Sequence, residues 1–207
     1  MIPIALLVSG RGSNLGAILD AVDNQYITKG CVSVVISNKP SAPALDVASK
    51  HKVPGIVIDD KGFPKNSWEY DQKTIAALKS YGVGPQVGLV LLAGYFRIIS
   101  PEFVTMYDRR IMNIHPALLP AYPGLEAQKQ ALDHGAKITG CTVHFVDKGV
   151  DTGPIILQAP VPIQDDDTVE TLSSRILREE HRLYPEAVRL FTEGKLVVKE
   201  RRALVSS

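Results

Sequence analysis

The sequence contains few cysteines, few aromatic residues and no surplus of charge of either sign. Its two cysteines, Cys31 and Cys141, lie far apart within apolar runs, so we expect buried free thiols in a reducing compartment. A net charge of +1 provides no overall field that would attract nucleic acid or an anionic membrane. No two histidines lie close together in the sequence, which argues against a zinc site.

No apolar run is long enough to cross a bilayer, and the run Ile2–Val8 lacks the basic start of a signal peptide. Because this run leads directly into a glycine loop, we interpret it as a first strand. These features predict a cytoplasmic protein, although an organellar protein that has lost its transit peptide would look the same. The 207 residues, 45% of them hydrophobic, suffice for one domain with a substantial core, and we expect a single domain over residues 1–207.

Apolar runs alternate with segments of helical period along the first half of the chain. Predicted strands cover residues 2–8, 31–36, 55–58, 87–93, 111–115, 142–146, 155–161 and 195–199. Predicted helices follow the first strand and then cover residues 41–48, 67–81, 100–107, 126–134 and 168–193. Repeated strand–helix–strand units predict an α/β fold, a Rossmann-like and mostly parallel twisted sheet with helices on both faces.

Ligands of such sheets bind beyond the carboxyl ends of the strands. Three unusual segments fall at predicted strand ends, namely Gly10–Asn14, Gly94–Arg97 and Asn113–His115. Their common location at one edge of the sheet favours a ligand site more strongly than any one of them does alone.

Asn113 and His115 lie two residues apart at the end of a predicted strand, so their side chains project to the same face. This pair suits acyl transfer, because the amide can hold an oxyanion while the imidazole moves a proton. For the two together we favour function over a turn-capping amide and a strand-end histidine. Asp151 could orient His115 as a third catalytic member, but taken singly it is better explained as a turn residue. His144 lies in an alternating strand, where we expect a core or surface role.

The loop Ser9–Asn14 has glycines that let backbone amides turn toward an anion at the start of a helix. It lacks the glycine spacing of the dinucleotide fingerprint and the Lys-Ser/Thr pair of a P-loop. A single phosphate monoester therefore fits better than NAD or a nucleoside triphosphate, and a turn without a ligand is an equal alternative.

Four segments of the chain resemble the folate-dependent formyltransferases, and within them the phosphoribosylglycinamide formyltransferases. These segments are Ser9–Leu15, Leu92–Pro101, Asn113–Gly124 and Val143–Pro154, in family order over nearly the whole chain. The Asn-x-His…Asp set is shared by enzymes of this fold that use formyltetrahydrofolate. The ending Pro-Ala-Tyr-Pro-Gly and the length point to the glycinamide ribonucleotide branch.

The resemblance implies a formyltransferase-type fold with antiparallel strands near the C-terminus. It implies formyl transfer from 10-formyltetrahydrofolate to the amine of glycinamide ribonucleotide in purine biosynthesis, without a metal. Residues 1–100 would mainly hold the phosphate, and residues 101–207 would mainly hold the folate and carry out catalysis. The protein would be a monomer or homodimer whose partners are these small molecules, with no nucleic acid or membrane.

The resemblance also implies roles for individual residues. The catalytic residues would be Asn113, His115 and Asp151. The ribonucleotide would be bound by Gly12, Ser13, Asn14 and Glu180. The folate would contact Phe96, Arg97, Ile98, Ile99, Asn113, Asp147 and Asp151.

The chain departs from the family pattern at Lys65–Ser67, where many relatives carry an arginine that meets the folate tail, and Arg11 occupies a variable position. Three alternatives stay open. Methionyl-tRNA formyltransferase would need a basic C-terminal extension, and formyltetrahydrofolate deformylase an N-terminal regulatory domain. A non-catalytic phosphate-binding module would keep the glycine loop but need neither Asn113 nor His115.

Overall fold

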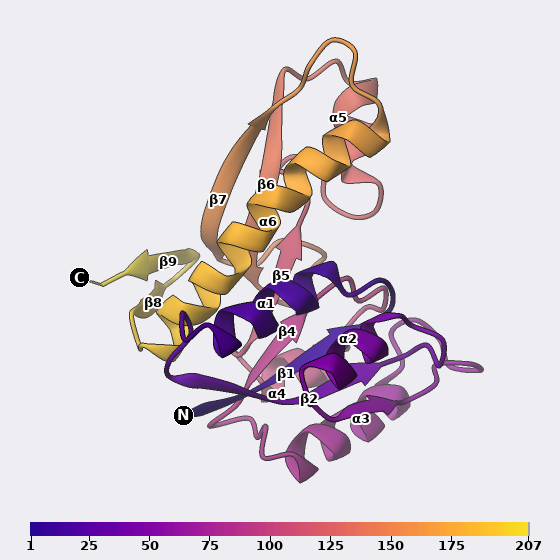
Figure 1. The fold of residues 1–207 in the computed structure, drawn as a ribbon, viewed down its shortest axis with the longest axis vertical. Helices are drawn as coiled ribbons and strands as arrows, with labels where there is room; N and C mark the ends of the chain where they lie inside the picture. Colours follow the sequence, from indigo (N-terminus) through magenta and orange to yellow (C-terminus); the bar gives the residue numbers. More distant parts are fainter. Residues whose placement is uncertain (207) are drawn as a thin grey trace.

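A computed structural model describes residues 1–206 as one sheet with helices on both of its faces (Figure 1). The strands are β1 (Ile2–Val8), β2 (Gly30–Ser37), β3 (Gly55–Val57), β4 (Leu89–Leu92), β5 (Ile111–His115), β6 (Ile138–Phe145), β7 (Ile155–Pro162), β8 (Leu196–Lys199) and β9 (Arg202–Val205). The helices are α1 (Ser13–Asp23), α2 (Ala44–Lys50), α3 (Trp68–Ser80), α4 (Pro101–Met106), α5 (Ala127–Asp133) and α6 (Val169–Thr192).

The strand order is β3-β2-β1-β4-β5-β6-β7-β9-β8. Strands β1 to β5 pair in parallel, whereas β6 is antiparallel to both β5 and β7. The predicted mostly parallel sheet with antiparallel additions near the C-terminus is confirmed. The order reverses direction between β1 and β4, and ligands of open α/β sheets bind at such a point.

Side chains of β1 alternate between two cores, one on each face of the sheet. Ile4, Leu6 and Val8 pack with apolar residues of α1, α2 and α6, whereas Ala5 and Leu7 pack with residues of α3 and α4. Figure 1 shows α1 and the long α6 side by side on the first face. Burial on both faces explains why the parallel strands appear in the sequence as continuous apolar runs.

Three helices begin at residues whose side chains accept a hydrogen bond from the first turn. Ser67 caps α3, Ser100 caps α4, and Thr168 forms a capping box with Thr171 at the start of α6. These starts agree with the sequence analysis. At α2 the N-cap is Pro43 and no side chain caps the helix.

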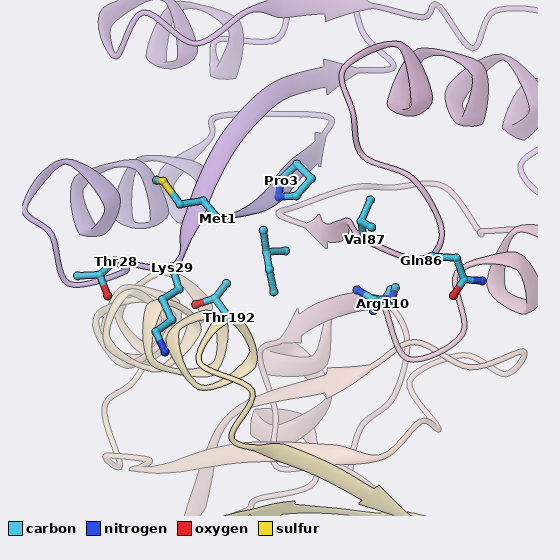
Figure 2. Close-up of a pocket in the computed structure, with 9 residues that line it drawn as sticks. Met1, Pro3, Thr28, Lys29, Gln86, Val87, Arg110 and Thr192 are labelled. Atoms are coloured by element: carbon cyan, nitrogen blue, oxygen red, sulfur yellow. The ribbon is translucent and has the colours of Figure 1, made fainter.

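A hollow of about 500 Å³ lies at the amino ends of β1, β4 and β5, where Pro3, Val87 and Arg110 contribute to its wall (Figure 2). Because the predicted ligand segments lie at the carboxyl ends of these strands, the hollow is not part of the candidate site. Among residues 1–206, no helix combines the length and the apolar character needed to cross a membrane.

Candidate active site

The loops that follow β1 and β4 contact each other directly at the carboxyl edge of the sheet. The Ser9 amide donates a hydrogen bond to the Gly94 carbonyl at 3.0 Å. The Phe96 amide donates to Ser9 Oγ at 2.9 Å. Because β5 pairs with β4, all three segments singled out in the sequence lie at this edge of neighbouring strands.

His115 is buried at the end of β5, with only 4% of its surface exposed. Its Nδ1 lies 3.3 Å from Asp151 Oδ2, and its Nε2 lies 2.8 Å from the Tyr122 carbonyl oxygen. Since a carbonyl oxygen can only accept, Nε2 carries a proton and donates it to this bond. Nδ1 is therefore the nitrogen that gains or loses a proton, and it faces the carboxylate.

Asn113 and His144 lie opposite each other in the antiparallel pairing of β5 with β6, so both side chains reach Asp151. Asn113 Nδ2 lies 3.4 Å from Asp151 Oδ1 and 3.3 Å from His144 Nε2. His144 Nδ1 donates to the Phe145 carbonyl at 2.9 Å, and its Nε2 lies 3.5 Å from Asp151 Oδ1. The expectation of a core or surface role for His144 overlooked this contact, which depends on strand register.

Both the backbone and the side chain of Asp151 are constrained. Its backbone adopts φ of 55°, in the left-handed region, and its Oδ2 accepts a hydrogen bond from the Gly124 amide at 2.8 Å. Burial alone would raise the pKa of this carboxyl, but hydrogen bonding to His144 and Gly124 and the charge of His115 lower it below its ordinary value. The carboxylate is therefore ionised at neutral pH.

Replacing Asp151 by asparagine should lower the pKa of His115 further. Burial already holds the pKa of this imidazolium below its ordinary value, while the Asp151 carboxylate and the Tyr122 carbonyl oppose that effect. A neutral amide cannot stabilise the imidazolium by charge, and asparagine tolerates a left-handed backbone. Titration of the His115 ring protons by NMR in both proteins measures the change. An unchanged or higher pKa in Asp151→Asn would contradict the pairing described above.

The glycine loop brings α1 against α6. Helix α1 begins after Gly12 without a side-chain cap and without an acidic residue in its first turn, so its first amides keep their capacity to bind an anion. Asn14 Nδ2 donates to Glu180 Oε2 at 2.8 Å, although 166 residues separate the two. Burial raises the pKa of Glu180, and the Asn14 amide partly offsets this rise. Among residues 1–206, the buried Asn14 Oδ1 has no hydrogen-bond partner.

Gly12→Ala should destabilise the protein strongly. Residue 12 has φ of +80°, and a Cβ there would lie 2.8 Å from both Cα and Cβ of Ala44. The left-handed backbone alone costs an alanine roughly 1–2 kcal/mol. Gly62→Ala is a matched control, since Gly62 has φ of +88° but no atom within 4 Å of a Cβ. Urea denaturation should show a larger loss for Gly12→Ala, and equal losses would remove the role of the contact with Ala44.

The predicted folate segment has two sides. Phe96 and Ile98 are exposed, at 64% and 51%, whereas the side chains of Arg97 and Ile99 are buried. The Arg97 guanidinium lies 3.9 Å from the centre of the Tyr70 ring, pairs with Asp60 at 3.3 Å and donates to the Pro64 carbonyl at 2.6 Å. Arg97 and Ile99 can therefore offer a ligand only their backbone.

Asp147, also predicted to contact folate, organises the loop that leads to Asp151. Its Oδ1 accepts hydrogen bonds from the Gly149 amide at 3.0 Å and from Thr152 Oγ1 at 2.7 Å. Within the described part of the chain, no group of three or more His, Cys, Asp or Glu side chains is arranged to hold a metal ion.

The sequence matches the formyl transferase family over residues 2–188. It is 45% identical over 196 residues to the trifunctional purine biosynthetic protein adenosine-3 of Drosophila melanogaster. The match covers 94% of this chain but only 14% of that protein. It is 41% identical over 200 residues to the phosphoribosylglycinamide formyltransferase of Escherichia coli (strain K12). This match covers 97% of this chain and 92% of that protein.

The fold is also similar to solved structures. Glycinamide ribonucleotide transformylase 1 from Symbiobacterium toebii matches with a TM-score of 0.94 and 51% identity, over 100% of this chain and 95% of that one. The family match spans most of the chain, and each relative is similar over nearly all of it. The chain therefore belongs to the formyl transferase family.

Proposed function

We propose that the protein transfers a formyl group from 10-formyltetrahydrofolate to the amine of N1-(5-phospho-D-ribosyl)glycinamide in purine biosynthesis. The products are formylglycinamide ribonucleotide and tetrahydrofolate. The observation that carries this proposal is the cluster formed by Asn113 and the buried His115 on β5 with Asp151 from the loop between β6 and β7. Membership of the family and the names of its relatives support the substrates.

The ribonucleotide binds in this proposal at the start of α1. The amides of Gly12, Ser13 and Asn14 hold the phosphate, because they lie at the positive end of the helix dipole. Glu180 accepts hydrogen bonds from the ribonucleotide, and its contact with Asn14 supports a location beside the phosphate. The two sides of this subsite thus come from α1 and α6.

The formylfolate binds in this proposal beside β4 and β5. The exposed side chains of Phe96 and Ile98 provide apolar surface for its rings, and the backbone of Arg97 and Ile99 provides hydrogen bonds. Asp147 shapes the loop that closes this subsite. No metal takes part in the proposed reaction.

The amine nitrogen attacks the formyl carbon, so that a carbon–nitrogen bond forms and the carbonyl oxygen becomes an oxyanion. Asn113 Nδ2 and the protonated Nδ1 of His115 donate to this oxyanion, which exists only near the transition state. Asp151 stabilises the imidazolium. The bond from carbon to the folate nitrogen then breaks, and the proton lost by the amine reaches that nitrogen through Asp151 and water.

The hydrogen bonds of Asn113 support its role as a donor. Its two contacts, at 3.3 and 3.4 Å, are long, so an oxyanion at about 2.8 Å would replace weak bonds by a strong one. His115 keeps the Tyr122 carbonyl as the partner of Nε2, which fixes the ring with Nδ1 beside Asp151, where its proton is available to the oxyanion.

We propose a cytoplasmic enzyme that acts as a monomer or homodimer on these small molecules, without nucleic acid. Cys31 and Cys141 are both free thiols, which supports a reducing compartment. Residues 1–100 are mainly the phosphate-binding half of one domain and residues 101–207 mainly its folate-binding and catalytic half, with Glu180 reaching the former from the latter.

The test is an assay of formylfolate consumption with and without glycinamide ribonucleotide. We expect turnover that requires the ribonucleotide and yields formylglycinamide ribonucleotide, identified by mass spectrometry. Consumption without the ribonucleotide would replace the proposal by a deformylase. Binding of formylfolate without turnover in either condition would indicate a non-catalytic binding module.

A further inference from the structure

The hydroxyl of Tyr184 lies where the last residue of β4 runs beside β5. Its oxygen is 3.1 Å from the carbonyl oxygen of Leu92, the last residue of β4, and 3.0 Å from that of Met112, the residue before Asn113. The side chain is fully buried, with 0% exposed. A single phenol proton is therefore shared between a carbonyl at the end of β4 and a carbonyl within β5.

Helix α6 carries a second contact one turn before Tyr184. Glu180 and Tyr184 are four residues apart, so they lie on the same side of the helix. Glu180 holds Asn14 of the glycine loop at 2.8 Å. One side of α6 thus contacts both the loop that starts α1 and the strand that carries Asn113 and His115.

We propose that Tyr184 is a positioning residue, which fixes the distance between the ribonucleotide subsite on α1 and α6 and the oxyanion donors on β5. This inference rests on the proposed function, because it concerns the alignment of the ribonucleotide amine with the formyl carbon. Reacting atoms must approach to about 3–3.5 Å in a suitable direction, and an error of about 1 Å can cost a hundredfold in rate. The two subsites are on different elements, so their spacing depends on how α6 is fixed to the sheet.

The chemistry of the phenol suits this role. A tyrosine side chain has only two rotatable bonds before its ring. Burial among close-packed residues therefore fixes the position of the hydroxyl relative to the sheet. Burial also raises the pKa of Tyr184 well above its ordinary value, so the group remains a donor over the whole working range of pH. The hydroxyl does not reach the reacting atoms in this scheme, since both of its partners are backbone carbonyls.

The simpler explanation is that Tyr184 only fills the core and pairs its own hydroxyl. Tyr107 provides a matched control, because it is equally buried and its hydroxyl donates to the Val83 carbonyl at 2.7 Å. Tyr107 belongs to the core on the other face of the sheet, with residues of α3 and α4. Phenylalanine at either position removes one buried hydroxyl and keeps the ring.

The experiment compares wild type, Tyr184→Phe and Tyr107→Phe in steady-state formyl transfer, at a temperature where melting curves show all three folded. We expect kcat of Tyr184→Phe to fall roughly tenfold, with KM for both substrates within about twofold of wild type. We expect Tyr107→Phe to keep wild-type kcat and KM. The pH dependence of kcat should keep its midpoint in Tyr184→Phe, because the His115–Asp151 pair is unchanged.

Equal kcat values for the two variants would overturn the inference, since a structural hydroxyl would then explain both. A rise in KM for the ribonucleotide at unchanged kcat would also overturn it, because Tyr184 would then affect binding and not alignment. A wild type that consumes no formylfolate with the ribonucleotide would instead refute the proposed function, before either variant is compared.

Discussion

His115→Ala should lower kcat for formyl transfer by about a thousandfold, which corresponds to ~4 kcal/mol of transition-state stabilisation. The substitution removes the imidazole whose Nδ1 lies 3.3 Å from Asp151 Oδ2, and with it the proposed cationic donor to the oxyanion. KM for both substrates should change little, because the interaction is made in the transition state. Steady-state kinetics with purified protein measures both quantities.

His51→Ala is the control for this prediction. His51 lies just after α2, and its Nδ1 pairs with Asp23 at 2.7 Å, away from the strand ends that carry the site. The same side chain is deleted, and we expect wild-type kcat. A loss of less than tenfold in His115→Ala, with the melting temperature close to that of wild type, would remove His115 from the proposed mechanism.

The parallel half of the fold could be predicted because its signals are local. Every residue of strand β4 is apolar and buried. Ser67 and Ser100 cap the helices that precede and follow it in the sequence. Strand β6 begins at Ile138, four residues before the predicted strand, because Thr139 and Gly140 resemble a loop in the sequence. Gly140 stands inside the strand because a Cβ there would lie 2.0 Å from the Ala159 carbonyl oxygen of β7, a close approach that only the paired structure reveals.

Strand β9 has no local signal that predicts it. Its hairpin with β8 turns at Glu200, which adopts φ of 54° although glycine or asparagine usually occupies such a position. Without that signal, the basic residues near the end of the chain resemble a solvated tail. The hydrogen bonds between β8 and β9 offset the cost of the left-handed backbone at Glu200, and the local sequence does not predict them.

The candidate site likewise contains residues that the local sequence predicts and residues that only the folded structure brings in. Asn113 and His115 follow from alternation along one strand, and the glycine loop follows from its composition. His144 enters through the register of β5 against β6, and the Tyr122 carbonyl enters through a loop that folds back on His115. Neither is encoded by local spacing. The burial of Arg97 likewise depends on Asp60 and Tyr70, which are distant in sequence.

Asn113→Ala should lower kcat by at least about a hundredfold, which is the usual cost of losing one oxyanion donor. Asn113 Nδ2 is a neutral side-chain donor beside the pair, 3.4 Å from Asp151 Oδ1. Stability should fall only modestly, because the two bonds that the amide makes are long. The control is Asn24→Ala at the exposed C-cap of α1, for which we expect wild-type kinetics.

The combined variant Asn113→Ala/His115→Ala separates a shared role from two independent ones. If both side chains stabilise the same oxyanion, the second deletion removes an interaction that the first has already weakened, so the losses should not multiply. We expect the double variant to retain nearly the kcat of His115→Ala, and measurement of all four proteins under one set of conditions gives the coupling. Losses that multiply fully, to about a hundred-thousandfold, would mean that Asn113 and His115 act on different atoms or in different steps, and the common oxyanion would have to be abandoned.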